Sequence, residues 1–305
     1  MSVLPAETLA ALAVVPDGTY VDCTLGGAGH AGRIAAQLSP AGRLIGIDQD
    51  ETAIAAAQVR LASAACRVSL VHDNFRNLTE ILASEGVLAV DGILFDLGVS
   101  SPQIDTAARG FSYMQDAPLD MRMDRRAARS AYTVVNEYSA ARLTEIFYDY
   151  GEERWAKRIA AFIEAARKER PIETTGELVE IIDRAVPKKV RAKGGHPAKR
   201  VFQAIRIEVN EELTILSDAV TAAAHALKPG GRLAVITFHS LEDRIVKRTM
   251  QQLARGCICP PHTPVCICGH TPELRLIGKA QTASLAECAA NARAKSAKLR
   301  VAEKL

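Results

Sequence analysis

The chain has 305 residues, of which 48% are hydrophobic and 24% are charged, and its formal net charge is +3. A hydrophobic fraction of this size can build a large core, and the length suits two domains. The N-terminus has no basic segment and no apolar run approaches the length of a membrane span, so we expect a soluble, cytoplasmic protein. The seven cysteines are an odd number, and Cys23 and Cys66 stand alone in apolar segments, which favours buried reduced thiols over a disulfide framework.

Strand-like and helical patterns alternate in the first third of the chain. We expect strands at residues 19–24, 42–48, 68–71 and 93–95. Helical patterns precede and separate them at residues 6–15, 31–38, 51–61 and 79–85. Strands that alternate with helices at this spacing predict a parallel α/β sheet.

The alternation stops from about residue 105 to residue 217, where the patterns are only helical, at residues 140–148, 152–168 and 175–185. Strand character returns at residues 231–238, after a turn at Lys228-Pro229-Gly230. A helix at 242–253, a cysteine-rich loop, a strand at 274–279 and a basic tail of helical propensity follow. We therefore predict a sheet domain formed by residues 1–104 and 218–305, interrupted by a helical insertion at 105–217.

A glycine-rich loop follows the first expected strand. Its sequence, Gly27-Ala28-Gly29-His30-Ala31-Gly32, matches G-x-G-x-x-G and opens a helix. Asp48 ends the second strand, where a dinucleotide-binding fold places the carboxylate that accepts hydrogen bonds from ribose hydroxyls. The loop and the acid together predict a nucleotide site, and they leave an NAD-dependent oxidoreductase as a serious alternative.

Three features favour S-adenosylmethionine over NAD as the ligand. Asp22 lies inside the first strand, where a carboxylate could face a cation. Thr24-Leu25 displaces the glycines toward the helix and leaves a roomier loop than a pyrophosphate needs. The third strand ends in Asp73-Asn74-Phe75, and Phe75 could cover one face of an adenine ring, although it could equally be a core aromatic.

The strand at residues 93–95 ends in a loop of small and hydroxyl residues. Asp96 stops the apolar run, and Ser100, Ser101 and Gln103 follow it. In an open parallel sheet the chemistry lies beyond the carboxyl ends of the strands, so these side chains are expected near a ligand. A strand cap and a turn use the same residue types, but two earlier strands end in the same way, which favours a site.

A basic segment lies in the helical insertion, where residues 184–207 hold eight Lys or Arg and no Asp or Glu. A run this lopsided in a chain of modest net charge predicts a phosphate track for RNA, made by Lys188, Lys189, Arg191, Lys193, Lys199 and Arg200. The tail adds further cations, namely Arg293, Lys295, Lys298, Arg300 and Lys304. Phe111 and Tyr113 could stack on a base turned out of folded RNA, or could simply be core residues.

Four cysteines, Cys257, Cys259, Cys266 and Cys268, fall within twelve residues. Four thiols can surround a zinc ion, but C-x-C pairs are tighter than the usual C-x-x-C knuckle. The alternative is a proline-stiffened loop with reduced thiols. We prefer that alternative and predict no metal, while both interpretations stay open.

Several segments, in order along nearly the whole chain, resemble the RsmH (MraW) family of bacterial methyltransferases. They are Asp22 to His30, Asp91 to Gln103, Arg109 to Tyr113, Pro118 to Asp124, Phe238 to Asp243 and Ser296 to Arg300. The resemblance implies a Rossmann-like class I S-adenosylmethionine-dependent methyltransferase sheet with an inserted all-helical domain for RNA recognition. Matched by motif, it implies S-adenosylmethionine contacts from Ala28, Gly29, His30, Asp48, Phe75, Asp96 and Gln103.

The reaction implied by the resemblance is methyl transfer to the exocyclic N4 of a cytidine in small-subunit (16S) ribosomal RNA. The lone pair of that nitrogen is delocalised into the ring, so a site must align the amine for direct in-line transfer and accept its proton. Asp96, Ser100 and Ser101 are the predicted catalytic residues, with no single base assigned. Further candidates are Asp120, Asp124, Glu242 and His239. The alternative role of His239 is only to cap the helix that begins near Ser240.

The expected partners are small-subunit ribosomal RNA or the assembled small subunit, with a homodimer left open and no membrane. Three other functions compete with this prediction. They are methylation of another nucleic acid, an NAD-dependent oxidoreductase and a non-catalytic ribosome-binding factor.

Overall fold

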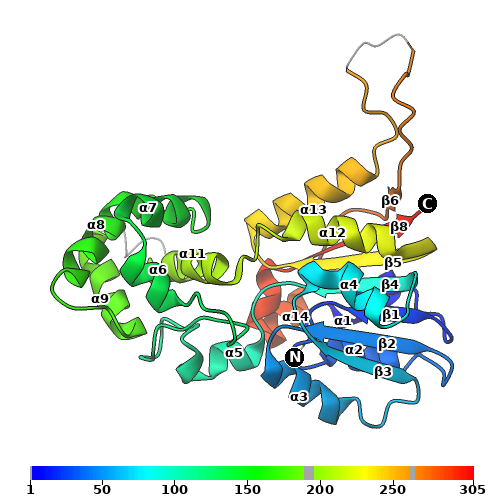
Figure 1. Cartoon of the computed structure of the whole chain (residues 1–305), viewed down its shortest axis with the longest axis horizontal. Helices are drawn as coiled ribbons and strands as arrows, with labels where there is room; N and C mark the ends of the chain where they lie inside the picture. The colour runs from blue at the N-terminus through cyan, green and yellow to red at the C-terminus, as the bar shows by residue number, and fades with distance from the viewer. Residues whose placement is uncertain (1, 189–195, 261–264) are drawn as a thin grey trace. The chain divides into compact units, whose positions relative to one another are not determined.

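The structure is a computed structural model that describes residues 2–188, 196–260 and 265–305 (Figure 1). The chain divides into two compact units, one formed by Met1–Gly98 with Leu213–Leu305 and the other by Val99–Glu212. In the described part of the chain no helix is both long and apolar enough to cross a membrane.

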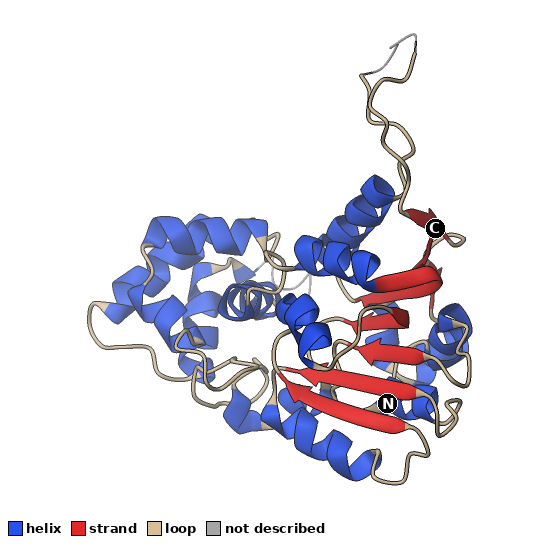
Figure 2. Cartoon of the chain, turned by 45° about the vertical axis from the view of Figure 1, so that its right-hand side comes forward, coloured by secondary structure: helices blue, strands red, loops and turns tan. Residues whose placement is uncertain are grey.

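The first unit is built on one sheet (Figure 2). Its strands follow the order β3-β2-β1-β4-β5-β8-β6, and a short β7 also pairs with β8. The strands from β1 to β5 run parallel, whereas β8 is antiparallel to β5, β6 and β7. The bounds are β1 Thr19–Asp22, β2 Arg43–Asp48, β3 Arg67–His72, β4 Val90–Asp96, β5 Leu227–Thr237, β6 Leu274–Leu276, β7 Gln281–Thr282 and β8 Lys298–Lys304.

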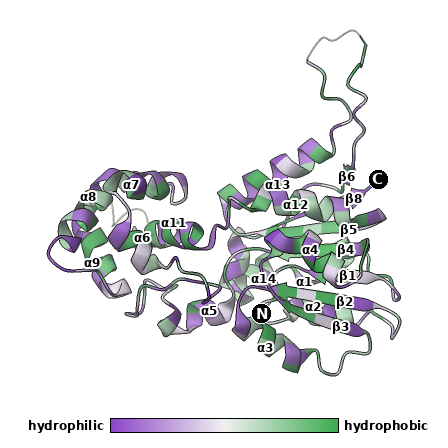
Figure 3. Cartoon of the chain, viewed as in Figure 1, coloured by the Kyte–Doolittle hydropathy of each residue, from purple (hydrophilic) through white to green (hydrophobic). Residues whose placement is uncertain are grey.

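Helices cover both faces of this sheet, which is why its central strands are apolar on both sides (Figure 3). One face packs with buried residues of α4 (Leu78–Ser84), α12 (Leu216–Ala226) and α13 (Ser240–Leu253). The other face packs with buried residues of α1 (Pro5–Leu12), α2 (Gly29–Ala35) and α3 (Glu51–Arg60). The remaining helices of the unit are η1 Phe75–Asn77, α14 Leu285–Ala290 and η3 Ala292–Ser296.

This sheet confirms the predicted fold class. The parallel order 3-2-1-4-5 is that of a doubly wound nucleotide-binding sheet, which places its ligand beyond the carboxyl ends of the strands. The antiparallel β8 follows β5, where a dinucleotide-binding fold of this order would continue with another parallel strand. The order therefore departs from that fold beyond its first five strands.

Two local predictions in this unit are wrong. The expected helical tail is confirmed in α14 and η3 but is wrong for the end of the chain, because residues 298–304 form β8, whose Leu299, Val301 and Ala302 are buried. The expected turn at Lys228-Pro229-Gly230 lies within β5, where the pairing with β4 shifts register and leaves these residues as an exposed irregularity. Charged residues in β8 and a Pro-Gly pair in β5 concealed the strand character.

The second unit is helical, with one isolated bridge, Pro118↔Thr174, as its only β pairing among the described residues. Its helices are α5 Ser101–Asp105, η2 Ala107–Arg109, α6 Ala131–Glu137, α7 Ala140–Asp149, α8 Ala156–Arg167, α9 Thr175–Ala185 and α11 Ala198–Asn210. Apolar stripes on α6 to α11 meet in a single buried core around Phe147, Ile159 and Ile205. Capping boxes at Ser130 and Thr174 fix where α6 and α9 begin.

Candidate cofactor and catalytic site

Three carboxyl groups lie at the carboxyl ends of adjacent parallel strands in the first unit. Asp22 ends β1, Asp48 ends β2 and Asp96 ends β4, and the pairing puts β1 between the other two. This edge of the sheet is where doubly wound folds bind their ligands. Because these strands are parallel, their carboxyl ends lie at the same edge, and Asp22, Asp48 and Asp96 therefore lie there together.

The glycine loop after β1 is fastened to the end of β2. The Gly26 N–H donates to Asp48 Oδ2 at 2.7 Å, and the Leu25 N–H donates to the Ile47 carbonyl at 3.0 Å. Gly26 and Ala28 both adopt left-handed conformations, with φ of 49° and 54°. A Cβ placed on Gly27 would meet no atom within 4 Å, so the loop leaves open space on that side. A ligand can therefore approach the backbone at Gly27 closely.

Asp22 has a different position from the one suggested by the sequence. Its side chain is 1% exposed and accepts hydrogen bonds from the N–H groups of Thr24 and Ala31. Burial, and secondarily the charge of Asp48, raises the pKa of Asp22 to about 7. Asp22 thus holds the glycine loop and the start of α2 in shape, and its carboxylate is turned to the backbone rather than to the surface.

Asp96 and His30 face each other, with Asp96 Oδ2 3.5 Å from His30 Nε2. Burial, and then the charges of Asp22 and Glu242, raises the pKa of Asp96 to about 8. Burial lowers the pKa of His30 to about 4, and the charge of Arg33 adds to this effect. At pH 7 the pair is therefore two neutral groups rather than an ion pair. The position of Asp96 is fixed by its own N–H, which donates to Thr24 Oγ1 at 2.6 Å.

Asp48 and Phe75 lie at the ends of β2 and β3. Asp48 accepts from the N–H groups of Gly26 and Asp50 at 2.7 and 2.9 Å, and each carboxylate oxygen has a second lone pair for a further donor. Burial raises the pKa of Asp48 to about 6. Phe75 is half-buried and packs edge-on against Phe95, with ring centroids 5.4 Å apart. Phe75 is thus part of the core and keeps a partly exposed side.

Ser100, Ser101 and Gln103 belong to the second unit, at the beginning of α5. The Gln103 N–H donates to Ser100 Oγ, and the Ser100 N–H donates to Gln103 Oε1, which forms a capping box. Gln103 is 5% exposed. The Ser100 hydroxyl and the Gln103 amide thus hold the start of this helix, which was not predicted from the sequence.

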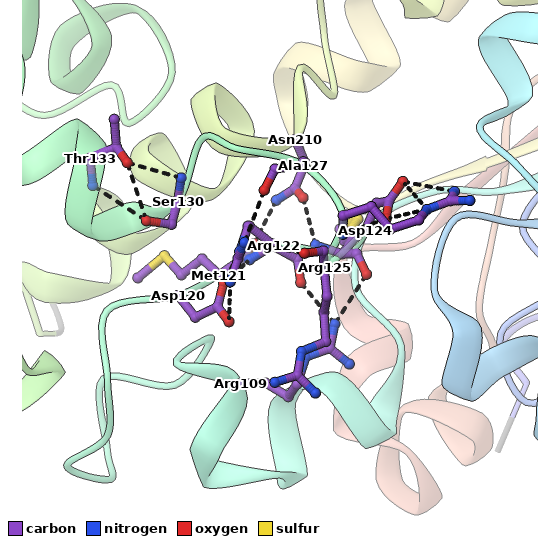
Figure 4. A network of polar contacts seen from close by, with 12 residues as sticks. Arg109, Asp120, Met121, Arg122, Asp124, Arg125, Ala127, Ser130, Thr133 and Asn210 are labelled. Carbon is purple, nitrogen blue, oxygen red and sulfur yellow. Dashed lines mark hydrogen bonds and ion pairs between the residues drawn. The ribbon is translucent and has the colours of Figure 1, made fainter.

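Asp120 and Asp124 are held in a polar network within the second unit (Figure 4). Asp120 pairs with Arg122 at 2.6 Å, and Asp124 pairs with Arg126 at 2.9 Å. Asn210 at the end of α11 donates to the Met121 carbonyl and accepts from the Met123 N–H, both at 2.8 Å. These two carboxylates are therefore engaged by neighbouring arginines. Asn210 was not predicted from the sequence, because it lies almost ninety residues away from its partners along the chain.

His239 caps α13, as one of the two interpretations of this residue predicted. Its ring accepts from the Glu242 N–H, while Glu242 Oε2 accepts from the Phe238 N–H at 2.8 Å. Glu242 is 1% exposed and lies 3.1 Å from His239 Nε2. The negative charge of Glu242 also raises the pKa of Asp96.

The basic segment of the second unit is described only in part, because Lys189, Arg191 and Lys193 lie outside the described residues. Lys188 and Lys199 are exposed. Arg200 is 52% exposed and lies 3.9 Å from the buried Glu153.

The two aromatic candidates of this unit pack against its helical core. Tyr113 stacks on His196 with centroids 5.2 Å apart, and Phe111 lies under the guanidinium of Arg109. Both rings thus have partners within the unit.

Three cations of the C-terminal segment have partners within the first unit. Lys298 and Arg300 both bind Asp243, at 2.9 and 2.7 Å, and Lys304 binds Glu273 at 3.0 Å. These ion pairs fasten β8 to the residues around it. Lys298, Arg300 and Lys304 are therefore engaged with acids of their own unit, and their contribution to the phosphate track stays a prediction.

The described residues at the strand ends fit a cationic nucleoside ligand. Asp96 Oδ1 and His30 Nε2 are buried and have no hydrogen-bond partner among the described groups, which is costly unless a ligand supplies one. The raised pKa values of Asp22, Asp48 and Asp96 mean that a positive charge nearby would favour their ionised forms. The open side of Gly27 gives room beside them.

Comparison with known proteins assigns the chain to a family. The model of the family described as the MraW methylase family matches residues 1–305. A ribosomal RNA small subunit methyltransferase H from Clostridioides difficile is 55% identical over 306 residues, which cover 100% of this chain and 98% of the relative. A protein of the same name from Symbiobacterium thermophilum is 55% identical over 304 residues, which cover 99% and 96%.

A solved rRNA methylase structure from Streptococcus thermophilus overlaps 98% of this chain and 93% of its own, with a TM-score of 0.42 and 12% identity. The family model and the close relatives span the chain from end to end. The chain belongs to the MraW methylase family.

Proposed function

We propose that this protein transfers a methyl group from S-adenosylmethionine to the exocyclic N4 of a cytidine in small-subunit ribosomal RNA. The observation that carries the proposal is the match of the whole chain to a methylase family, together with full-length relatives named ribosomal RNA small subunit methyltransferase H. Membership of a methylase family also removes the oxidoreductase alternative and the non-catalytic one.

S-adenosylmethionine supplies an electrophilic methyl group carried on a sulfonium. In this proposal the backbone at Ala28 and Gly29 lies against the cofactor, and Asp48 accepts hydrogen bonds from its ribose hydroxyls. The half-buried Phe75 covers one face of the adenine. His30, neutral at pH 7, can exchange a hydrogen bond through Nε2, and Gln103 completes the proposed cofactor contacts.

Asp96 has the main chemical role in this proposal. A cationic cofactor favours the ionised carboxylate, so binding releases the proton that the free protein keeps at pH 7. The ionised Asp96 then accepts a hydrogen bond from the cytosine amine and stabilises the positive charge that develops on the nitrogen. Ser100 and Ser101 are the other two residues predicted to take part in catalysis.

The helical segment at residues 105–217 is proposed to hold the RNA. The exposed Lys188 and Lys199 support this role, because exposed cations can neutralise phosphates and release their counterions. Lys189, Arg191, Lys193 and Arg200 belong to the same proposed track. The cytoplasmic location and the homodimer stay predictions.

A pair of variants on β4 tests the proposed role of Asp96. Asp96→Asn removes the carboxylate at the carboxyl end of the strand, whereas Asp91→Asn makes the same change at the opposite end, where Asp91 binds Thr19 and Lys228. With labelled S-adenosylmethionine and small ribosomal subunits, we expect Asp96→Asn to lower the transfer rate by at least about 100-fold. Asp91→Asn should keep most of the rate. Equal rates for the two variants would exclude the proposed role.

A further inference from the structure

Four cysteines outside the proposed methyl-transfer site lie close together between α13 and β6. Cys257, Cys259, Cys266 and Cys268 are free thiols, and their Sγ atoms all lie within 4.8 Å of one another. We propose that these four thiols bind one zinc ion, which fixes the conformation of this segment. The proposal is independent of the methyl-transfer reaction.

The spacing of the sulfur atoms fits a single tetrahedral ion. The Sγ atom of Cys266 lies 3.5 Å from that of Cys257, 4.0 Å from that of Cys259 and 3.5 Å from that of Cys268, and the Cys257–Cys268 distance is 3.8 Å. Zinc binds thiolates at about 2.3 Å, so a regular tetrahedron has sulfur–sulfur edges of about 3.8 Å. A disulfide would need about 2.0 Å. An iron–sulfur cluster would place several metal and sulfide atoms between the thiolates and hold them farther apart.

Backbone groups around Cys257 and Cys268 are arranged to support thiolates. Cys268 accepts hydrogen bonds from the N–H groups of Ile258 and His270, and Cys257 accepts one from the N–H of Cys259. Gly269 adopts φ of 59°, a conformation that glycine reaches without steric cost. Such outer contacts orient metal ligands and compensate part of their negative charge.

The segment has no apolar core that could hold its shape. Ile258, Val265 and Ile267 are 53%, 71% and 84% exposed, and none of the described residues in 255–260 and 265–272 is buried. The two ends meet where the Glu273 N–H donates to the Leu253 carbonyl at 2.8 Å, and from there the segment runs away from α13 (Figure 1). A bound metal commonly replaces the core in a unit this small.

The positions of the four sulfur atoms favour a zinc site, whereas the sequence favoured a proline-stiffened loop with reduced thiols. C-x-C pairs are tight, but two of them facing each other bring four thiols to one point, a geometry that the spacing within each pair does not reveal. The tetrahedral set of four sulfurs suits zinc, which prefers thiolate ligands and has no redox chemistry.

Metal analysis of the purified full chain tests the proposal. The protein is prepared with a non-chelating reductant and without a metal-binding tag, and its zinc and iron are measured by mass spectrometry. We expect about one zinc per chain, as a closed four-thiolate structural site requires. The double variant Cys257→Ser/Cys266→Ser takes one ligand from each pair and should lose the zinc. Cys288→Ser, a free and half-buried cysteine outside the cluster, should keep it.

A cobalt titration of metal-free wild-type protein gives a second readout that needs no variant to fold. Four thiolates around Co²⁺ should give intense d–d and thiolate-to-metal charge-transfer absorption that saturates at one ion per chain and that zinc abolishes. The proposal would be overturned if the purified protein contained no zinc and the metal-free protein did not bind one cobalt ion per chain. Stoichiometric iron in place of zinc, or zinc retained by the double variant, would overturn it as well. Because these readouts do not involve methyl transfer, a failure of the proposed reaction would leave them unchanged.

Discussion

The buried carboxyl of Asp96 gives the stability of the protein a dependence on pH. Its pKa is about 8 in the folded chain and 3.8 in a model peptide. Between these values the unfolded chain loses a proton that the folded chain keeps, so the free energy of unfolding falls as the pH rises from about 4 to about 8. Below about pH 4 the carboxyl is neutral in both states, and the protein is then most stable with respect to this group. The stability contribution falls as the pH rises and is fully lost above about pH 8, the pKa in the folded chain.

Asp96→Asn tests this dependence in the ligand-free protein, because an amide does not titrate in this range. Asp22 and Asp48 are present in both proteins, so the effects of their own burial cancel in the difference, which reports Asp96 together with its interaction with Asp22. A pKa difference of this size corresponds to about 5 kcal/mol in a fully buried group. Because the Asp96 side chain is 25% exposed, solvent screening reduces the effect. We therefore expect denaturant unfolding to show a stability gain of the variant, relative to the parent, that grows by on the order of 2 kcal/mol between pH 4 and pH 8. Parallel pH profiles would show that Asp96 has an ordinary pKa.

Gly27 is the second residue whose role can be tested directly. A methyl group at Gly27 meets nothing within 4 Å, so Gly27→Ala should leave thermal stability unchanged or slightly raise it. It should weaken S-adenosylmethionine binding in calorimetry by about 10-fold or more, since close approach of the ligand to the backbone requires glycine.

The matched control for Gly27→Ala is Gly32→Ala in α2. Its new methyl would have Arg60 Nε at 3.7 Å as its nearest neighbour, an ordinary contact. It should bind the cofactor as the parent does. Equal affinities for the two variants would place the ligand away from Gly27.

The sequence allowed the strand-end positions of Asp48 and Asp96 to be predicted, because each ends an apolar run that forms a strand. It did not allow their electrostatics to be predicted. The pKa of Asp96 depends on Asp22 from β1 and Glu242 from α13, which only the folded sheet brings near. The burial of Asp22 has the same origin, since α2 covers it after the glycine loop turns back.

The loop at residues 120–126 depends on one side chain of α11. Asn210 forms three hydrogen bonds, to the Met121 carbonyl, to the Met123 N–H and to the Arg206 carbonyl. It is 9% exposed, so its removal would leave buried groups without partners. Asn210→Ala should destabilise the second unit by about 3 kcal/mol in denaturant unfolding.

Gln203→Ala is the control for Asn210→Ala in the same helix. Gln203 is half-buried and donates a single side-chain hydrogen bond, to the Tyr150 carbonyl at 3.0 Å. Its loss should cost about 1 kcal/mol. A smaller effect at Asn210 than at Gln203 would contradict the role assigned to Asn210.

Elements with a clear apolar period were predictable, and elements that depend on distant partners were not. Helix α9 was predicted at residues 175–185 and begins and ends there, because a capping box and an amphipathic stripe are both local. Strand β8 was missed since its lysines and arginine indicated an exposed tail. Their partners, Asp243 and Glu273, come from α13 and the start of β6.

RNA binding by the whole molecule should depend on the exposed cations of the proposed track. Lys188→Gln/Lys199→Gln removes two exposed charges from the proposed track. In binding assays with small-subunit RNA, the double variant should reduce the slope of log affinity against log salt by about 2. Lys157→Gln/Lys168→Gln removes two exposed charges from α8 and its C-terminal end and should leave the slope nearly unchanged. Equal slopes for the two double variants would exclude the proposed track.

The most direct test of the central claim is the chemical identity of the product. Small ribosomal subunits from cells that lack this activity are incubated with the protein and labelled S-adenosylmethionine, and the RNA is digested to nucleosides for mass spectrometry. The proposed function predicts label in N4-methylcytidine, and Asp96→Asn should abolish it. Label in any other nucleoside, or no label while the cofactor still binds, would contradict the claim.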